Sequence, residues 1–594
     1  MLEKRRTAPF LLLALAALTG LWSIGHELPH SYYSDEEHLV KRALSFGSGD
    51  LNPHWFHKPT FFMYVLFAEY AIYYLAGRAL GLWESVTDFA VGYIIDPSAF
   101  ILLGRLTNVC LRAAAVWLLW RTVKRHFGER AAFLSGLMLC LSAGVVASSQ
   151  QVKEDTLSMF LAVLSLHWTL DHVETRRLSR LLLAAAAAGL GTATKLYPAM
   201  MALPIGMALL LARPDAGTPR LPAMARAGAL ATAVFILAFF AGAPYCFLDP
   251  LGRESTFGRV TRLFEQKADA GPEVGPGDNF IQRPVGHLEG AAQYVGVLIS
   301  PGGLGPVIGG IALAGLVWAV VRGGARARIA VAFPLALGVA SVAAYPGYAG
   351  TRHQIALYPF LCIAGGLILA RVGARWPRAR TVLHATLGIA LLFPAHAIVS
   401  RALERSREET RNAAKGWIEE NIPAGTRLVL SENGPPLLET EEQLADLLEK
   451  ARQADRRGQF TAHFATYLQY RILAARGRTC YHVAEIRMAW WRAAEPEGGL
   501  QELATDYDRD AANPLKKVGV RDYDDYLQDG YRYAVVHSDS YGLFQEGSRP
   551  SRDRPAYYRF YRDLFRRGRL VKEFSRDGGY SGPTVRIYEL VRSS

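Results

Sequence analysis

Two short clusters of carboxylates are the residues of this chain best suited to acid–base chemistry. The first begins with Asp35 and Glu36, shortly after an apolar N-terminal segment, and the second is Glu154-Asp155. A carboxylate can deprotonate a hydroxyl or an amine, or bind a divalent metal, beside a bound substrate. A simpler interpretation is open for both: the first is a solvated loop, and in the second Lys153 pairs with Glu154 or Asp155.

Basic and aromatic side chains recur at the ends of predicted helices on the same side as these acids. Arginine binds phosphate oxygens through two parallel N–H groups, and lysine acts as a point charge. A basic side chain can also simply extend from a helix end to the membrane interface. Three cations beside two acidic clusters favour an anionic headgroup bound between them. The candidates are His57, Lys58, Lys195, Tyr197, Arg352 and His353.

Long apolar runs organise the first 400 residues of the 594-residue chain. A helix needs about 20 mostly apolar residues to cross a bilayer. We therefore predict a mostly α-helical, polytopic membrane domain over residues 1–400 with about eleven spans. They lie near residues 8–26, 101–121, 131–149, 156–173, 181–196, 198–213, 227–247, 304–321, 329–346, 354–371 and 381–399.

The distribution of Lys and Arg supports this count. Every dense basic loop, from Lys4-Arg5-Arg6 to the arginines between residues 371 and 380, falls on one side of the predicted membrane. Cytoplasmic loops carry this excess, so we expect a cytoplasmic N-terminus and an extracytoplasmic C-terminal domain in the inner membrane. The net charge of +13 is then explained by loops, without nucleic-acid binding.

Two further apolar stretches, residues 60–77 and 290–303, are predicted to be helices that lie in the membrane interface. The first is rich in Tyr and Phe and contains Glu69, a composition that suits the interface. If it crossed the membrane and nothing else changed, every later basic loop would face outward.

Residues 401–594 are polar and mixed, and we predict a soluble α/β domain there. No pair among the five cysteines has metal-ligand spacing, and no nucleotide-binding or hydrolase motif is found. A donor substrate would therefore have to arrive in the membrane. The predicted elements are helices at 404–421, 439–456 and 555–566, and strands at 427–430, 533–536, 570–574 and 585–590.

The ordered set of motifs over about residues 1–370 resembles the GT-C class of membrane glycosyltransferases. The resemblance is to the branch that contains protein O-mannosyltransferases and the aminoarabinose transferase acting on lipid A. His57 departs from the pattern, because relatives often have an acid before the Lys-Pro pair. The matching residues are Asp35-Glu36, Lys58-Pro59, Asp155, Thr194-Lys195-Leu196-Tyr197-Pro198, and Arg352 with Tyr358-Pro359.

The resemblance implies transfer of a sugar from polyprenyl phosphate to a lipid, protein or glycan acceptor at the outer membrane face. It implies that Asp35 is the base and that Glu36 and Asp155 orient the acceptor or bind a divalent metal. The departing phosphate would be stabilised by Lys58, Lys195 and Arg352, and the remaining substrate-binding residues would be His57, Glu154, Tyr197, His353 and Tyr358. Two alternatives are a transporter or flippase for a lipid-linked sugar and a non-catalytic relative that binds lipid.

Overall fold

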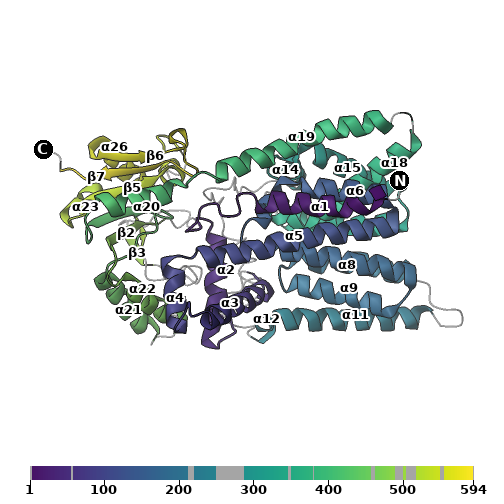
Figure 1. Cartoon of the computed structure of the whole chain (residues 1–594), viewed down its shortest axis with the longest axis horizontal. Coiled ribbons are helices and arrows are strands. Elements are labelled where there is room, and N and C mark those ends of the chain that lie inside the picture. Colours follow the sequence, from purple (N-terminus) through teal and green to yellow (C-terminus); the bar gives the residue numbers. More distant parts are fainter. Residues whose placement is uncertain are drawn as a thin grey trace.

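The chain forms a long helical bundle with a smaller, sheet-containing unit at one end, as the computed structural model shows (Figure 1). The N-terminus lies at the end of the bundle away from this unit, and the C-terminus lies in it. The structure describes residues 3–54, 58–211, 220–248, 286–344, 350–376, 378, 380–455, 462–487, 500–502, 517–548, 551 and 554–592.

Helices of the bundle overlap each of the eleven predicted spans. Their buried side chains form one large apolar core that extends from Leu12 to Ile398. The helices are α1 (Glu3–Leu21), α5 (Ser98–Phe127), α6 (Glu129–Cys140), α7 (Ala143–Ser149), α8 (Asp155–Thr175), α9 (Leu178–Thr192), α10 (Ala202–Leu211), α11 (Arg220–Gly242), α12 (Tyr245–Leu248), α15 (Gly305–Arg322), α16 (Ala325–Ala344), α18 (Tyr358–Arg375) and α19 (Arg380–Arg405).

Among the described residues, six helices are long and apolar enough to cross a membrane by length and composition. The number rises to seven if α6 and α7, which are bent by 61° at their junction, form one broken span. Others, such as α9, are shorter apolar helices, and α8 carries polar side chains along its length. The mostly helical membrane fold is confirmed, and the count of eleven spans stays a prediction.

Several further helices, most of them short, complete the bundle. Figure 1 shows α2, α3 and α4 gathered at the end of the bundle that faces the sheet-containing unit. The stretch predicted at 60–77 is α3, and Tyr70 on it packs edge-on against Phe100 at the start of α5. These elements are α2 (Ser34–Ser45), η1 (Phe46–Ser48), α3 (Phe61–Ala79), α4 (Val86–Ile95), η2 (Tyr197–Met201), α14 (His287–Ile299), α17 (Thr351–Gln354) and η3 (Ile355–Leu357).

The C-terminal unit contains a five-stranded sheet of order β2-β1-β5-β7-β6. Strand β1 runs parallel to β2 and β5, and β7 runs antiparallel to β5 and β6. The elements are α20 (Thr410–Asn421), β1 (Arg427–Ser431), α21 (Glu441–Asp455), α22 (Ala462–Ala475), β2 (His482–Ile486), β3 (Leu500–Glu502), β4 (Lys517–Gly519), α23 (Tyr523–Gln528), β5 (Tyr533–His537), α24 (Ser538–Tyr541), α26 (Pro555–Arg567), β6 (Arg569–Phe574), η5 (Arg576–Gly578) and β7 (Val585–Glu589).

The predicted α/β character of this unit is confirmed, with one correction and several omissions. The helix predicted at 404–421 is broken: α19 ends at Arg405 and α20 begins at Thr410. Glu409 caps the new helix, since its carboxylate accepts from the backbone N–H of Arg411. The prediction missed α22, α23 and strands β2, β3 and β4.

Direct hydrogen bonds join the C-terminal unit to the bundle. The Tyr32 hydroxyl donates to Asn412 Oδ1 at 2.6 Å, and Asn412 Nδ2 donates to the carbonyl of Glu27. The guanidinium of Arg411 lies 3.6 Å from the centre of the Tyr32 ring. The loop between α1 and α2 is therefore held against the start of α20.

A fully buried ion pair fixes α2 to α5. Arg105 donates from Nε and Nη2 to the two carboxylate oxygens of Glu36 at 2.9 and 2.8 Å, and both side chains are 0% exposed. Arg105 Nη1 also donates to the carbonyls of Ile24 and His26. Such a fork holds the loop after α1, α2 and α5 in one arrangement.

Breaking this pair is expected to destabilise the protein strongly. In Arg105→Met the Glu36 carboxylate would stay buried without its partner, and we expect a loss of about 3–5 kcal/mol in the free energy of unfolding. The double variant Arg105→Met/Glu36→Gln should recover part of this loss, because it removes the uncompensated charge. Unfolding of the purified protein in detergent measures both; a single variant as stable as the wild type would contradict the assignment.

Candidate active site

The structure brings the two carboxylate clusters together through lysines. Lys58 Nζ lies 3.2 Å from Asp35 and 3.1 Å from Glu154. Lys195 Nζ lies 3.4 Å from Glu154 and 2.5 Å from Asp155. Four separate segments thus meet in one alternating row of charges: α2, the loop before α3, the turn between α7 and α8, and the turn after α9. These five residues are called the charge row below.

The members of the charge row differ in accessibility. The side chains of Glu154 and Asp155 are 2% and 5% exposed, whereas that of Asp35 is 24% exposed. Lys58 and Lys195 are intermediate. Asp35 is therefore the carboxylate of the row that a substrate can reach most easily, and Glu154 and Asp155 mainly hold the lysines.

Mutual attraction keeps the groups of the row charged despite their burial. Burial raises the pKa of Glu154, but Lys58 and Lys195 outweigh it and lower that pKa to about 2. Burial lowers the pKa of Lys58, but Glu154 and Asp35 outweigh it and raise the pKa above its usual value. The pKa of Lys195 is raised in the same way, by Asp155 and Glu154.

Lys153 lies beside the row but in a different environment. Its Nζ donates to the Tyr33 hydroxyl, lies 3.8 Å from the centre of the Tyr33 ring and is 3.9 Å from Asp35. Burial lowers the pKa of Lys153, and the attraction of Asp155 and Asp35 does not fully offset it. The sequence suggested a local pair with Glu154 or Asp155, whereas the structure places Lys153 against α2.

Glu36 and Asn108 position the turn that carries Lys153, Glu154 and Asp155. The Glu36 carboxylate accepts from the backbone N–H of Val152 at 2.6 Å, and Asn108 Nδ2 donates to the carbonyls of Gln151 and Lys153. Glu36 is 0% exposed, and its carboxylate is also held by Arg105. The structure therefore gives Glu36 a positioning role, and its role in orienting the acceptor or binding a metal stays a prediction.

The other predicted residues fall in three groups. The Tyr197 hydroxyl and His353 Nδ1 are joined by a 2.7 Å hydrogen bond, which links the turn after α9 to α17. Tyr358 is fully buried in the apolar core of the bundle, so the structure gives it a packing role. Arg352 lies in α17, but its side chain is outside the described part, as is the whole of His57.

Sequence reasoning missed Arg105 and Asn108, although a signal was present. Both are polar residues inside an apolar run predicted to span, and both are fully buried. Polar side chains within a span are costly unless they are paired or functional. Their spacing of three residues on one helix also places them on the same face.

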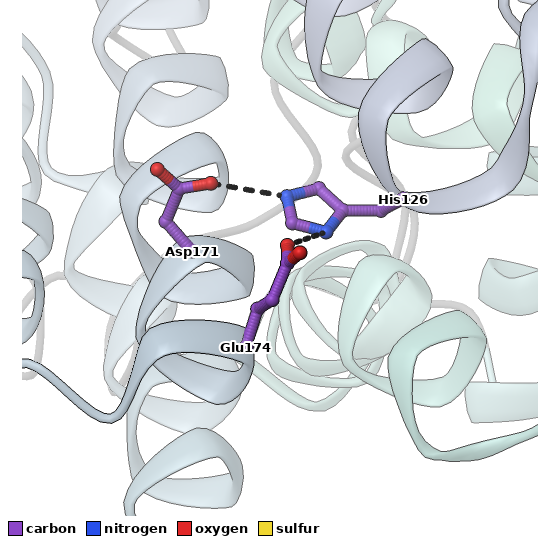
Figure 2. A group of neighbouring side chains, drawn as sticks. All are labelled: His126, Asp171 and Glu174. Atoms are coloured by element: carbon purple, nitrogen blue, oxygen red, sulfur yellow. Dashed lines mark ion pairs between the residues drawn. The ribbon is translucent and has the colours of Figure 1, made fainter.

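No cofactor is established for this protein. In the charge row each carboxylate already contacts a lysine, so a divalent cation there would compete with the lysines for the carboxylate oxygens. A second charged cluster, formed by His126, Asp171 and Glu174, has ligand atoms within 4.8 Å of one another (Figure 2).

This second cluster lies far from the charge row. Asp171 follows Asp155 by sixteen residues along α8, which corresponds to about 24 Å at the rise of an α-helix. His126 lies 3.2 Å from Asp171 and 3.3 Å from Glu174, and Arg125 Nε lies at the same distances from the same two carboxylate oxygens. Arg125 thus already contacts both carboxylates, and the cluster fastens α5 to α8.

Comparison with known families supports the resemblance seen in the motifs. Residues 101–241 match the family described as dolichyl-phosphate-mannose-protein mannosyltransferase. This segment contains the turn before α8 and Lys195, which together supply three of the five residues in the charge row. The match covers less than half of the chain, and together with the apolar helices it indicates a multi-pass membrane protein. A search of curated proteins finds no match.

Solved structures with similar folds extend over most of the chain. ArnT from Cupriavidus metallidurans bound to undecaprenyl phosphate is 14% identical, with 98% of each chain covered and a TM-score of 0.49. The Archaeoglobus fulgidus oligosaccharyltransferase in the apo form is 11% identical, with 89% of this chain and 69% of that chain covered and a TM-score of 0.43.

The charge row predicts a specific response to acid. A depressed pKa in the folded state means that Glu154 stabilises the fold above its ordinary pKa of 4.5, and that this contribution is lost as pH falls toward 2. In Lys58→Met the pKa of Glu154 should rise, so acid destabilisation should begin at higher pH. Unfolding midpoints between about pH 3 and 7 measure this.

The matched control is Lys450→Met, which removes an exposed lysine that pairs with Asp446 on α21. Its unfolding midpoint should follow the wild-type pH profile. If Lys58→Met also followed the wild-type pH profile, the lowered pKa of Glu154 would not depend on Lys58.

Proposed function

We propose that the protein is a membrane glycosyltransferase that moves a sugar from a polyprenyl phosphate to an acceptor at the outer face of the cytoplasmic membrane. The observation that carries the proposal is the row Asp35–Lys58–Glu154–Lys195–Asp155, in which the reachable Asp35 contacts Lys58, and Glu154 holds Lys58 and Lys195 together. This combination supplies a base and an anion-binding site at one point. The family match over residues 101–241 supports the same class of donor.

Asp35 is assigned as the general base. It would accept the proton of an acceptor hydroxyl or amine, whose oxygen or nitrogen attacks the anomeric carbon of the donor sugar. The bond between that carbon and the phosphate oxygen breaks at the same time, with oxocarbenium character at the sugar. Its exposure of 24%, against 2% for Glu154, suits this role better than that of the buried Glu154.

Lys58 and Lys195 are assigned to the departing phosphate. An ammonium group has three N–H donors, and each of these lysines has two close carboxylate contacts. Each can therefore direct a further donor to a phosphate oxygen without losing its position. Fixed charges of this kind stabilise the negative charge that develops as the phosphate leaves, with no reorganisation at the moment of reaction.

The remaining predicted residues complete the proposal. Tyr197 and His353 bring α17 next to Lys195, because they are hydrogen-bonded and the Tyr197 ring lies 5.2 Å from Lys195 Nζ. Arg352, the neighbour of His353, is assigned to the same phosphate. His57, next to Lys58 in sequence, is assigned to substrate binding. We assign charge stabilisation to the lysines and not to a metal, because the lysines already contact the carboxylates.

Replacing Asp35 tests the proposed chemistry. Asp35→Asn keeps the size of the side chain but removes the base, and general bases contribute about 10²–10⁴-fold to rates. We expect acceptor-dependent release of polyprenyl phosphate by the purified enzyme to fall roughly 100-fold or more. The control Asp446→Asn, on the exposed face of α21, should release it at the wild-type rate. Unchanged release by Asp35→Asn would refute the role of Asp35.

The orientation in the membrane is tested separately. We propose that the N-terminus is cytoplasmic and that the charge row and C-terminal unit are extracytoplasmic, as the basic loops require. A reporter fused after Arg407, between α19 and α20, should report an outside location, and one fused at Arg177, between α8 and α9, a cytoplasmic one. The opposite pattern would place the charge row on the wrong membrane face.

A further inference from the structure

A second polar pocket lies between the C-terminal unit and the helices at the end of the bundle. Its volume is about 290 Å³, near the lower end of the range for small-molecule sites. The C-terminal unit and the bundle each contribute one wall. The wall from the C-terminal unit includes Glu432, Tyr467 and Arg487, and the wall from the bundle includes Tyr32, Glu37 and Tyr93.

The position of this pocket in the sheet is one where α/β folds bind ligands. Strand β1 lies between its parallel neighbours β2 and β5. After β1 the chain forms β2 on one side of it, and later forms β5 on the other side. Ligands bind outside the carboxyl ends of strands at such a point. Glu432 directly follows β1 and Arg487 directly follows β2, so both stand at that edge.

The charges of the pocket disfavour an anionic ligand. Four glutamates and three cations line it, and two of the cations are already paired, Lys41 with Glu37 and Arg471 with Glu439. His30, also in the lining, adds no positive charge at neutral pH, since burial lowers its pKa to about 4. A phosphate group would meet an excess of carboxylates here, and Arg487 is the one lining cation outside these two close pairs.

Arg487 is the loosely held charge of the pocket. Its Nε lies 3.8 Å from Glu432 and 3.9 Å from Glu485, beyond hydrogen-bond distance. Its Nη1 is buried and has no hydrogen-bond partner within the described part of the chain. A guanidinium with donors to spare beside carboxylates with acceptors can bind several hydroxyl groups at once.

Three tyrosines, Tyr32, Tyr93 and Tyr467, lie in the lining beside aliphatic side chains such as Ile101 and Leu437. Aromatic rings offer large apolar faces and, in tyrosine, a hydroxyl that needs a partner when buried. A ligand with C–H faces and many hydroxyls fits this mixture of rings, carboxylates and a guanidinium. A short, uncharged saccharide has that chemistry.

We infer that this pocket binds an uncharged saccharide unit of the acceptor. The pocket and the charge row use different faces of α2, because Asp35 contacts Lys58 whereas Glu37 and Lys41 line the pocket. The bound unit is therefore not the one that receives the new sugar. That the bound molecule is the acceptor rests on the proposed function. The inference narrows this acceptor to a molecule that contains a glycan.

Binding of the full-length protein in detergent to an array of short neutral oligosaccharides tests the pocket without requiring transfer. Other arms of the array carry phosphorylated oligosaccharides and unglycosylated peptides. The wild type should bind neutral oligosaccharides, and Arg487→Gln and Tyr467→Ala should bind them roughly tenfold or more weakly, because each loses ligand contacts.

The matched controls are Arg476→Gln, an exposed arginine after α22, and Gln469→Ala, on the exposed side of α22. Both should bind like the wild type, and all variants should show wild-type elution on size exclusion. Absence of neutral oligosaccharide binding, selective binding of peptides or phosphorylated glycans, or full binding by Arg487→Gln would each overturn the inference.

Enzymatic release of polyprenyl phosphate separates this inference from the proposed function. Arg487→Gln should raise the acceptor KM and leave slow, acceptor-independent release unchanged, because the charge row is intact. Absence of acceptor-dependent polyprenyl phosphate release by the wild type would refute the proposed function, while saccharide binding could still occur. Loss of acceptor-independent release in Arg487→Gln would contradict a pocket that acts only in binding.

Discussion

The buried carboxylate of Glu154 is the group on which the proposed site depends. It is 2% exposed, and a charge so far from water is tolerated only when it is closely paired. Lys58 and Lys195, from turns far apart in the chain, both supply that pairing. Each lysine in turn holds a second carboxylate, so the arrangement of Asp35 and Asp155 follows from the need to neutralise Glu154.

Three consecutive acids on α2 have three different environments, and the geometry of a helix explains this. Successive side chains on an α-helix point about 100° apart. Asp35 reaches Lys58, Glu36 is buried against Arg105, and Glu37 lines the pocket beside the C-terminal unit. Helix α2 therefore lies between the proposed phosphate site and the proposed saccharide pocket.

The contacts between the bundle and the C-terminal unit give α2 its fixed place. The loop before α2 is held by Asn412 and Arg411, and α2 itself is held by Arg105 of α5. Movement of the C-terminal unit would be transmitted to the loop that leads into Asp35. The charge row and the pocket thus both depend on the position of α2, although their proposed ligands differ in charge.

Sequence by itself determined the helices of the bundle, the buried strands β1, β5 and β7, and the candidate charges Asp35, Lys58, Asp155 and Lys195. These signals are local: apolar runs, clusters of basic residues and short motifs. The sequence did not predict strand β2, because its residues are mostly of intermediate burial and form no apolar run.

Only the tertiary structure decided which charged side chains form ion pairs with one another. Glu36 pairs with Arg105 across 69 positions in sequence, and Lys195 with Asp155 across 40. Neither partner can be read from local pattern, because burial of a charge is settled by packing between helices. That packing made Glu36 a positioning residue and Tyr358 part of the core, and left Asp35 facing the site.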